Sequence, residues 1–313
     1  MKKLSHLTVL LCVVCIFING CGGKSQEDLD AELANAWTEG NINTVHQLLN
    51  EGADPNIQVV DSAGKDLPII ISASAEGETE TIRLLVEAGA DLNASDQNGQ
   101  TPLHNAACKQ TAKLLLELGA DVNAKDNNRL TPLHQAGSTD IANLLLKNGA
   151  AIEAKCQDGL TPLHYATSNS ETAIVALLLD RGANVNALDD QERTPLHYAA
   201  LTDKTEMAKL FLEQGTELEQ MCLDDWTPLH YAASKGQAKM VELFLNAGIM
   251  VNICRVTIPA GTPLVEGPQG WEPDKDYIVF GPTALYLALS EGHTEVAELL
   301  RKHGGVEQAE DLL

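Results

Sequence analysis

The sequence predicts an all-α repeat solenoid, in which short pairs of helices stack in chain order. The tetrapeptide Thr-Pro-Leu-His occurs five times, at intervals of 30, 30, 33 and 33 residues, and begins at Thr101, Thr131, Thr161, Thr194 and Thr227. Each copy leads to an apolar run and then to a glycine. Four of these glycines stand twelve residues before the next threonine: Gly119, Gly149, Gly182 and Gly215.

Each position of this motif has a physical role in a pair of helices. Threonine caps the first helix through its hydroxyl, and the proline after it loses no amide that the helix needs. Alanine pairs let two helices approach closely, as at Ala106-Ala107, Ala199-Ala200 and Ala232-Ala233. The second helix has apolar residues at helical spacing, and glycine then ends it in a left-handed conformation. Because one pair cannot bury its apolar face alone, neighbouring pairs must stack.

These motifs resemble the ankyrin repeat, and the same frame extends towards both ends of the chain. Pro68 lies 33 residues before Thr101, and Thr283-Ala284-Leu285-Tyr286 opens a last copy. The resemblance implies an ankyrin-repeat domain over residues 29–313. Its eight expected repeats lie near 31–67, 68–100, 101–130, 131–160, 161–193, 194–226, 227–282 and 283–313.

Three departures from the pattern stand out. The third and fourth repeats are three residues short, which predicts a tighter turn between their helices. The seventh repeat has an insertion at 253–280, in which two β-prone stretches flank Gly267-Pro268-Gln269-Gly270 and predict an extended hairpin. This insertion is either functional or a tolerated surface loop. The third departure is a side chain at positions where the motif usually has glycine: Arg129, Glu192 and Asp225.

The first residues predict a targeting segment. Lys2 and Lys3 precede the apolar run 7–18, which is too short to span a bilayer but has the length of a signal-peptide core. Ile18-Asn19-Gly20-Cys21 resembles the lipobox of bacterial lipoproteins, which implies a signal peptide over 1–20, a lipid on Cys21 and a short tether over 21–28. An ordinary secretory signal with a chance cysteine is the alternative. Gly22, where an aspartate would retain the protein in the inner membrane, favours a place in the bacterial cell envelope on the outer membrane, facing the periplasm.

Charge and residue types argue against nucleic-acid binding, catalysis and metal binding. A net charge of −23 repels phosphate backbones, so we expect no nucleic-acid partner. Five histidines recur once per repeat, too far apart to share a metal ion, and the resemblance implies that each bonds backbone in a neighbouring turn: His104, His134, His164, His197 and His230. No catalytic motif, metal site or cofactor site is expected. Cys222 and Cys254, in adjacent fingers, could form a disulfide, whereas Cys108 is expected in a first helix as a small buried group.

Ankyrin proteins generally bind partners through the tips of their fingers (the loops that lead into each first helix) and the inner helix surface. Carried over by position, the partner surface comprises Gln100, Leu130, Leu160, Arg193, Leu201, Leu223, Trp226 and Lys235, together with Trp271 of the insertion. Four of these are apolar where exposure is expected, although a leucine there can also pack on its neighbouring finger. The sequence therefore predicts a non-catalytic, membrane-anchored protein that binds another protein. The alternatives are capture of a small molecule such as haem, or a stress-protection or immunity partner of a neighbouring envelope enzyme.

Overall fold

The computed structural model describes residues 24–60, 64–254, 256–257, 264–267, 270–273 and 279–307. Cys21 and the signal segment lie outside these residues, as do the side chains of 255–280, including that of Trp271. The chain divides into two compact units, residues 1–127 and 128–313, and each unit is described by itself. Among the described residues, no helix has both the length and the apolar character that crossing a bilayer requires.

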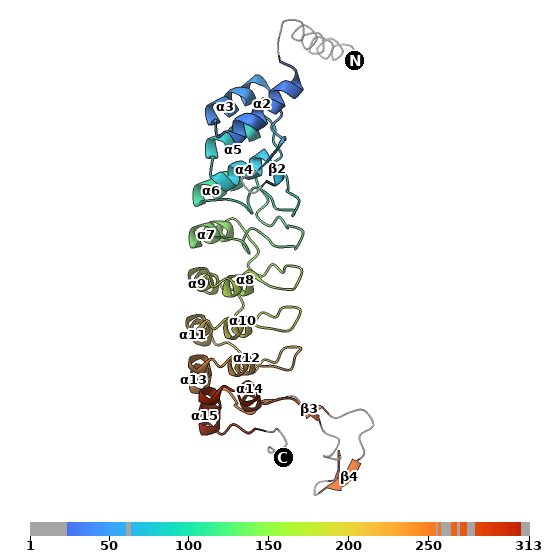
Figure 1. Ribbon diagram of the computed structural model, residues 1–313, viewed down its shortest axis with the longest axis vertical. Coiled ribbons are helices and arrows are strands. Elements are labelled where there is room, and N and C mark those ends of the chain that lie inside the picture. Colours follow the sequence, from blue (N-terminus) through green and yellow to red (C-terminus); the bar gives the residue numbers. More distant parts are fainter. Residues whose placement is uncertain are drawn as a thin grey trace. The chain divides into compact units, whose positions relative to one another are not determined.

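The first unit consists of helical pairs and one small hairpin (Figure 1). Helices α2 and α3 pack on each other, as do α4 and α5, while β1 and β2 pair antiparallel with Val59 opposite Leu67. The elements are α2 (Gln26–Thr38), α3 (Ile42–Glu51), β1 (Gln58–Val60), β2 (Asp66–Pro68), α4 (Ile69–Glu76), α5 (Thr79–Glu87) and α6 (Lys109–Glu117). Ile69, Ile70 and Ile71 are buried in its core.

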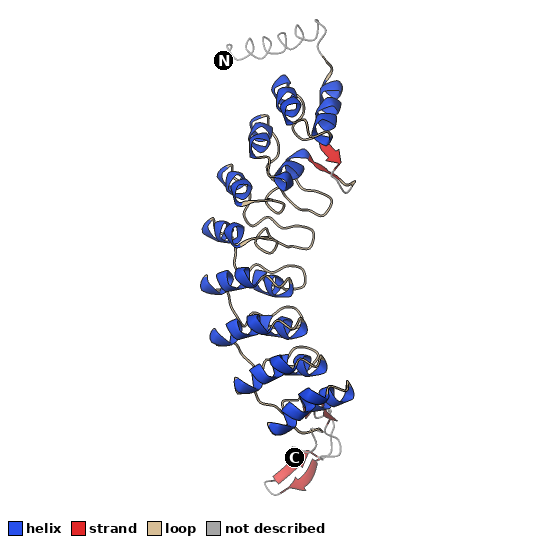
Figure 2. Cartoon of the chain, turned by 60° about the vertical axis from the view of Figure 1, so that its left-hand side comes forward, coloured by secondary structure: helices blue, strands red, loops and turns tan. Residues whose placement is uncertain are grey.

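The second unit stacks its helices in two rows (Figure 2). One row contains the first helices of successive repeats, α8 (Pro162–Ser168), α10 (Pro195–Leu201), α12 (Pro228–Ser234) and α14 (Ala284–Ser290). The other row contains the second helices, α7 (Thr139–Lys147), α9 (Thr172–Asp180), α11 (Thr205–Glu213), α13 (Ala238–Asn246) and α15 (Thr294–Lys302). Each helix contacts the next in its own row, and Phe211 and Phe244 are fully buried among them. The predicted all-α repeat architecture is therefore confirmed.

The insertion contains two short antiparallel ladders, as the predicted hairpin requires. Strand β3 (Val256–Thr257) pairs with β6 (Val279–Phe280), and β4 (Leu264–Gly267) pairs with β5 (Gly270–Pro273). The register places Gly267 opposite Gly270 at the predicted turn.

The prediction for the two short repeats is wrong in its detail. Residues 101–107 and 131–137 form turns instead of a first helix followed by a tight turn. Helix α6 begins 8 residues after Thr101, whereas α11 begins 11 residues after Thr194. Because a helix advances ~1.5 Å per residue and extended chain ~3.3 Å, three fewer residues reach the second helix only if the first helix unwinds.

This shortening also changes the environment of Cys108. The residue is the N-cap of the second helix α6, not part of a first helix, and it is half-buried. Its Sγ lies 3.3 Å from the Thr111 hydroxyl, and this hydrogen bond lowers the pKa of the Cys108 thiol. Cys108 is therefore not the small buried apolar group of a first helix that the sequence predicted.

Polar side chains join each turn to the next within a unit. The side-chain oxygen of Asn56 accepts from the Asp91 amide at 2.9 Å, and that of Asn93 accepts from the Asp121 amide at 3.1 Å. In the second unit, Asn186 accepts from the Glu217 amide at 2.8 Å. In each of these pairs, an asparagine side chain of one turn accepts a hydrogen bond from a backbone amide of the following turn, which would otherwise lack an acceptor.

Side chains occupy left-handed backbone at three finger positions. Arg129, Glu192 and Asp225 have φ values of 60°, 56° and 63°, so these turns keep the glycine-type conformation that the motif predicts. Ser170 and Asp203 do the same in turns between helices, with φ values of 66° and 56°. Each such side chain costs on the order of 1 kcal/mol.

Gly159 is needed for close approach as well as for its positive φ, and replacing it with alanine tests this. A Cβ at Gly159 (φ 76°) would lie 2.7 Å from the Asp190 amide nitrogen, whereas one at Gly182 (φ 84°) would meet nothing within 4 Å. Both alanines lose ~1–2 kcal/mol from the left-handed backbone, so we expect Gly159→Ala to lose clearly more. Urea denaturation followed by circular dichroism measures the difference, and equal losses would contradict the close approach.

Candidate partner-binding surface

Hydrogen bonds tie the fingers of the second unit together. The amide of Asp190 donates to the Asp158 carbonyl at 3.1 Å, and the amide of Leu223 donates to the Gln191 carbonyl at 3.0 Å. Within each finger a tight turn closes on itself, as where the Cys222 amide donates to the Trp226 carbonyl at 3.0 Å. Successive fingers therefore present their side chains at a fixed spacing.

The recurring histidines hold the base of these fingers in place. His164 Nδ1 lies 3.2 Å from the Thr161 amide nitrogen and accepts its proton, so the imidazole carries its own proton on Nε2. That Nε2 lies 3.0 Å from the Arg193 carbonyl oxygen of the next finger. His197 reaches the Trp226 carbonyl at 3.2 Å, and His230 reaches the Pro282 carbonyl at 3.1 Å. The predicted structural role is confirmed for these histidines.

The threonine hydroxyl shares the capping of the first helix with the histidine. In the Thr161 and Thr194 repeats the two residues form a capping box, in which the hydroxyl faces the backbone amide of the histidine and the imidazole accepts from the amide of the threonine. The hydroxyl also lies 2.9 Å from His Nδ1. In the last repeat Tyr286 replaces the histidine, and there the Thr283 hydroxyl does accept from the Tyr286 amide at 3.1 Å. The histidine therefore takes over part of the capping role.

Two predicted binding residues meet on one aromatic side chain. The Arg193 guanidinium lies 5.9 Å from the centre of the Tyr231 ring and bonds the Asp224 carboxylate at 2.9 Å. The Trp226 ring packs edge-on against Tyr231 with centroids 4.9 Å apart. Arg193 and Trp226 are half-buried, whereas Leu223, three residues before Trp226, is 53% exposed. Tryptophan and arginine held in a rigid cluster are typical of a protein-binding surface, and the exposed leucine adds an apolar contact beside them.

The other predicted positions have varied environments. Leu130 is only 8% exposed, so the expectation that it faces solvent is wrong. Leu160, Leu201 and Gln100 are half-buried, and Lys235 is exposed at the end of α12. The burial of Leu130 corresponds to the alternative in which a leucine packs within the fold.

Three residues were not predicted from the sequence, although their contacts determine much of the arrangement of this surface: Tyr198, Tyr231 and Asp224. The Tyr198 hydroxyl donates to Asp189 at 2.7 Å, and burial and then this hydrogen bond raise the pKa of Tyr198. Burial and then the Cys222 thiol raise the pKa of Tyr231. The tyrosine that follows the histidine in several repeats was the available signal.

The cysteine pairing is not formed in this structure. Cys222 is a buried free thiol 3.5 Å from the Tyr231 hydroxyl, and Cys254 is a half-buried free thiol. No group of three or more metal-ligating side chains lies together among residues 24–307 as far as these are described.

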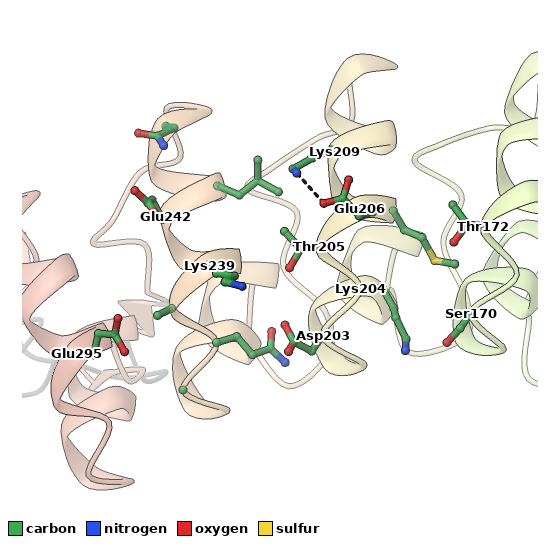
Figure 3. A pocket seen from close by; sticks show the side chains of 16 residues that line it. Ser170, Thr172, Asp203, Lys204, Thr205, Glu206, Lys209, Lys239, Glu242 and Glu295 are labelled. Carbon is green, nitrogen blue, oxygen red and sulfur yellow. Dashed lines mark hydrogen bonds and ion pairs between the residues drawn. The ribbon is translucent and has the colours of Figure 1, made fainter.

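A groove of about 1100 Å³ lies along the turns between first and second helices in the second unit. Figure 3 shows lysines and carboxylates mixed along its walls. Lys209 bonds Glu206 at 2.7 Å, so these charges neutralise each other. The remaining labelled charges are of both signs, with three carboxylates and two lysines: Asp203, Lys204, Lys239, Glu242 and Glu295. This groove offers a mixed-charge surface, with no charge of one sign concentrated in it.

The architecture defines a helical repeat protein with projecting fingers, and comparison identifies its family. A model of ankyrin repeats in three copies matches residues 33–126, 111–189 and 182–255, and a single ankyrin repeat matches 280–310. The matches cover more than half of the chain. The chain therefore belongs to the ankyrin-repeat family, whose repeats mediate protein–protein interaction.

Several curated proteins resemble a short part of the chain. SH3 and multiple ankyrin repeat domains protein 1 from Homo sapiens is 39% identical over 69 residues, which is 22% of this chain and 3% of that protein. ARF GTPase-activating protein Git from Drosophila melanogaster is 35% identical over 88 residues, 28% of this chain and 12% of that protein. Protein phosphatase 1 regulatory subunit 12A from Mus musculus is 39% identical over 66 residues, 21% and 6% respectively. The chain thus spans only a small fraction of these relatives.

The histidine bonds generate a pH prediction. Burial lowers the pKa of His164, His197 and His230 from 6.5 to about 4. Each of these histidines therefore binds a proton near pH 6.5 in the unfolded chain, but only near pH 4 in the folded chain. Because the unfolded chain binds more protons in this window, the free energy of unfolding falls as the pH falls through it. From pH 7.5 to pH 5.5 each histidine should lower the free energy of unfolding by ~1.4 kcal/mol, and the three together should lower it by about 4 kcal/mol.

Urea denaturation at the two pH values measures this loss. His197→Gln cannot take up the proton, so the loss should shrink by about a third. His303→Gln is the matched control, because His303 is exposed near the end of the last helix. A pH dependence that is the same in all three proteins would show that the buried imidazoles do not cause it.

Proposed function

We propose that this chain is a non-catalytic, lipid-anchored scaffold of a bacterial cell envelope that binds a protein partner through the fingers of its second unit. The cluster of Leu223, Trp226, Arg193 and Tyr231 is the observation on which the proposal depends. It combines an exposed leucine with a half-buried tryptophan and guanidinium, both of which pack on the buried ring of Tyr231. Aromatic residues and arginine held rigidly at a surface lose little conformational entropy on binding, so they contribute most of the energy at many interfaces.

The rigidity of the cluster has identifiable causes. The Trp226 carbonyl accepts from His197, and the Trp226 ring stacks at 28° to the ring of His230, with centroids 6.4 Å apart. The Arg193 carbonyl accepts from His164. Backbone and side chain of both residues are therefore held before any partner arrives, which supports binding with little rearrangement.

Among the relatives, one is named a regulatory subunit and another a protein with SH3 and multiple ankyrin repeat domains. A scaffold that binds a protein also fixes where that protein is held. A lipid on Cys21 would give this chain its place, at the outer membrane facing the periplasm. Two or three acyl chains anchor a protein far more firmly than one.

Substituting Leu223 tests the surface. Leu223→Ser removes a large apolar side chain that is 53% exposed beside the cluster, so recovery of crosslinked partners from intact cells should fall ~10-fold. Met250→Ser is the matched control, because Met250 is similarly exposed, at 57%, but lies in the turn after a second helix. The double variant Trp226→Ala, Leu160→Ala should behave like Leu223→Ser. Unchanged recovery of every partner in both finger variants would rule out this surface.

Cys21 provides the test of the anchor. Cells grown with an alkyne analogue of palmitate should label the wild-type chain and leave Cys21→Ala unlabelled, and the variant should leave the membrane fraction. Cys108→Ala, which removes a thiol of the folded domain, controls for acylation elsewhere and should keep both the label and the membrane location. Wild-type chain found unlabelled in the cytosol would contradict the proposed anchor.

A further inference from the structure

In two repeats of the second unit, a tyrosine closes the space between a finger and the preceding first helix. The Tyr198 hydroxyl donates to Asp189 Oδ2 at 2.7 Å, and its ring packs edge-on against His164 with centroids 5.6 Å apart. Tyr231 packs in the same way on His197, with ring centroids 6.0 Å apart, but the counterpart of Asp189 is there Cys222, whose thiol lies 3.5 Å from the Tyr231 hydroxyl. The Tyr231 hydroxyl also lies 3.2 Å from Asp224 Oδ2. Asp189 is thus the finger acid that accepts a phenol at this position of the finger.

The first unit has the same frame around the finger at residues 96–100. The Asp96 amide donates to the Gln100 carbonyl at 3.0 Å, and the Gln100 amide donates to Asp96 Oδ1 at 2.8 Å. The equivalent bonds of Asp189 and Arg193 measure 3.1 and 2.8 Å. Asp96 is therefore the counterpart of Asp189 by hydrogen bonding as well as by sequence position.

The side chain that fills the space in the second unit is missing from the first. The residue after the histidine is Asn105 instead of tyrosine, and its Nδ2 turns back to the Thr101 carbonyl at 3.3 Å. Ile71 stands where the second unit has His164, since it lies 33 residues before His104. A cavity of about 460 Å³ opens here, and Ile71, Asp96 and Asn105 all line it.

The cavity has the two kinds of wall that a phenol needs. Leu67, Ile71 and Ala75 form an apolar side, and Leu67 and Ile71 belong to the buried core. Asp96 lies at the polar side with Oδ1 already holding the Asn98 and Gln100 amides. Its other oxygen, Oδ2, corresponds to the atom that accepts the phenol in Asp189.

We propose that this cavity binds a tyrosine side chain presented by a protein partner, with the ring against the apolar side that Leu67, Ile71 and Ala75 form and the hydroxyl donating to Asp96 Oδ2. The inference rests on the proposed function, because it requires a protein partner. It goes further by assigning a second contact in the first unit and the residue type that fills it. The partner's tyrosine completes an arrangement that the second unit completes with its own.

The first test fills the cavity from within. Asn105→Tyr should place a ring in the cavity and raise the urea midpoint of the full chain, because it adds buried contacts and a hydrogen bond. Asn105→Phe lacks the hydroxyl and should give a smaller increase. Asn105→Ala is the control and should give none. A lowered midpoint for both aromatic variants in a folded protein would show that the cavity does not accept the ring, and would overturn the proposal.

The second test uses N-acetyl-L-tyrosinamide as the probe, titrated into full chain labelled at isoleucine methyl groups. Binding should shift the Ile71 methyl upfield in a saturable way, because an aromatic ring shields protons over its face. The shift should vanish in Asn105→Tyr and require at least threefold more probe in Asp96→Asn, which keeps an oxygen for the finger amides. N-acetyl-L-phenylalaninamide should also bind at least threefold more weakly.

Three results would overturn the proposal: no shift at Ile71, an equal shift in Asn105→Tyr, or tighter binding of N-acetyl-L-argininamide, which would make the cavity a receptor for a cation. The outcome is separable from that of the proposed function. The probe reports on the first unit without any partner, whereas the Leu223→Ser crosslinking experiment reports on the second unit.

Discussion

The structure of the second unit depends on bonds that a repeat can make only with its neighbour. A buried imidazole has its Nδ1 bound to its own threonine and its Nε2 bound to the carbonyl just before the next threonine, as in His164 and Arg193. Neither nitrogen is solvated, so removal of the neighbour would leave a buried donor unpaired. The carbonyls that accept belong to Arg193 and Trp226, which also carry side chains of the candidate surface. Stability of the stack and orientation of that surface therefore have the same cause.

Periodicity in the sequence was enough to predict the repeats and the second helices, and the resemblance to the ankyrin repeat implied the role of the histidines. Periodicity was not enough for the third and fourth repeats, where a deficit of three residues does not reveal which element absorbs it. The second helix has the larger apolar face to bury, so the first helix unwinds and residues 101–107 become turns. Leu130 was placed on the surface for a related reason. Its position in the motif is a finger position, but burial depends on neighbouring side chains that periodicity does not specify.

The candidate surface was predicted in part, because its positions follow from the motif while its contacts do not. Arg193 and Trp226 were found by position, and Tyr231, which joins them, was not. Aromatic residues are only 4% of this chain, so a tyrosine that recurs after the histidine carries more information than its position in a helix suggests. Each of these rings is held between a finger and a helix of another repeat, and that relation is visible only in three dimensions.

Departures from the repeat give the chain its specificity. A partner that met identical fingers could bind in several registers of nearly equal energy, because shifting by one repeat would recover the same contacts. Residues that differ from one repeat to the next make these binding registers unequal in energy. Leu223 and Trp226 distinguish one finger of the second unit, and Asn105 leaves one cavity in the first unit where other repeats have a tyrosine. The unwound first helix and the cavity occur in the same short repeat. One repeat thus combines a local loss of regular structure, caused by its three missing residues, with a position that a partner can recognise, where asparagine replaces tyrosine.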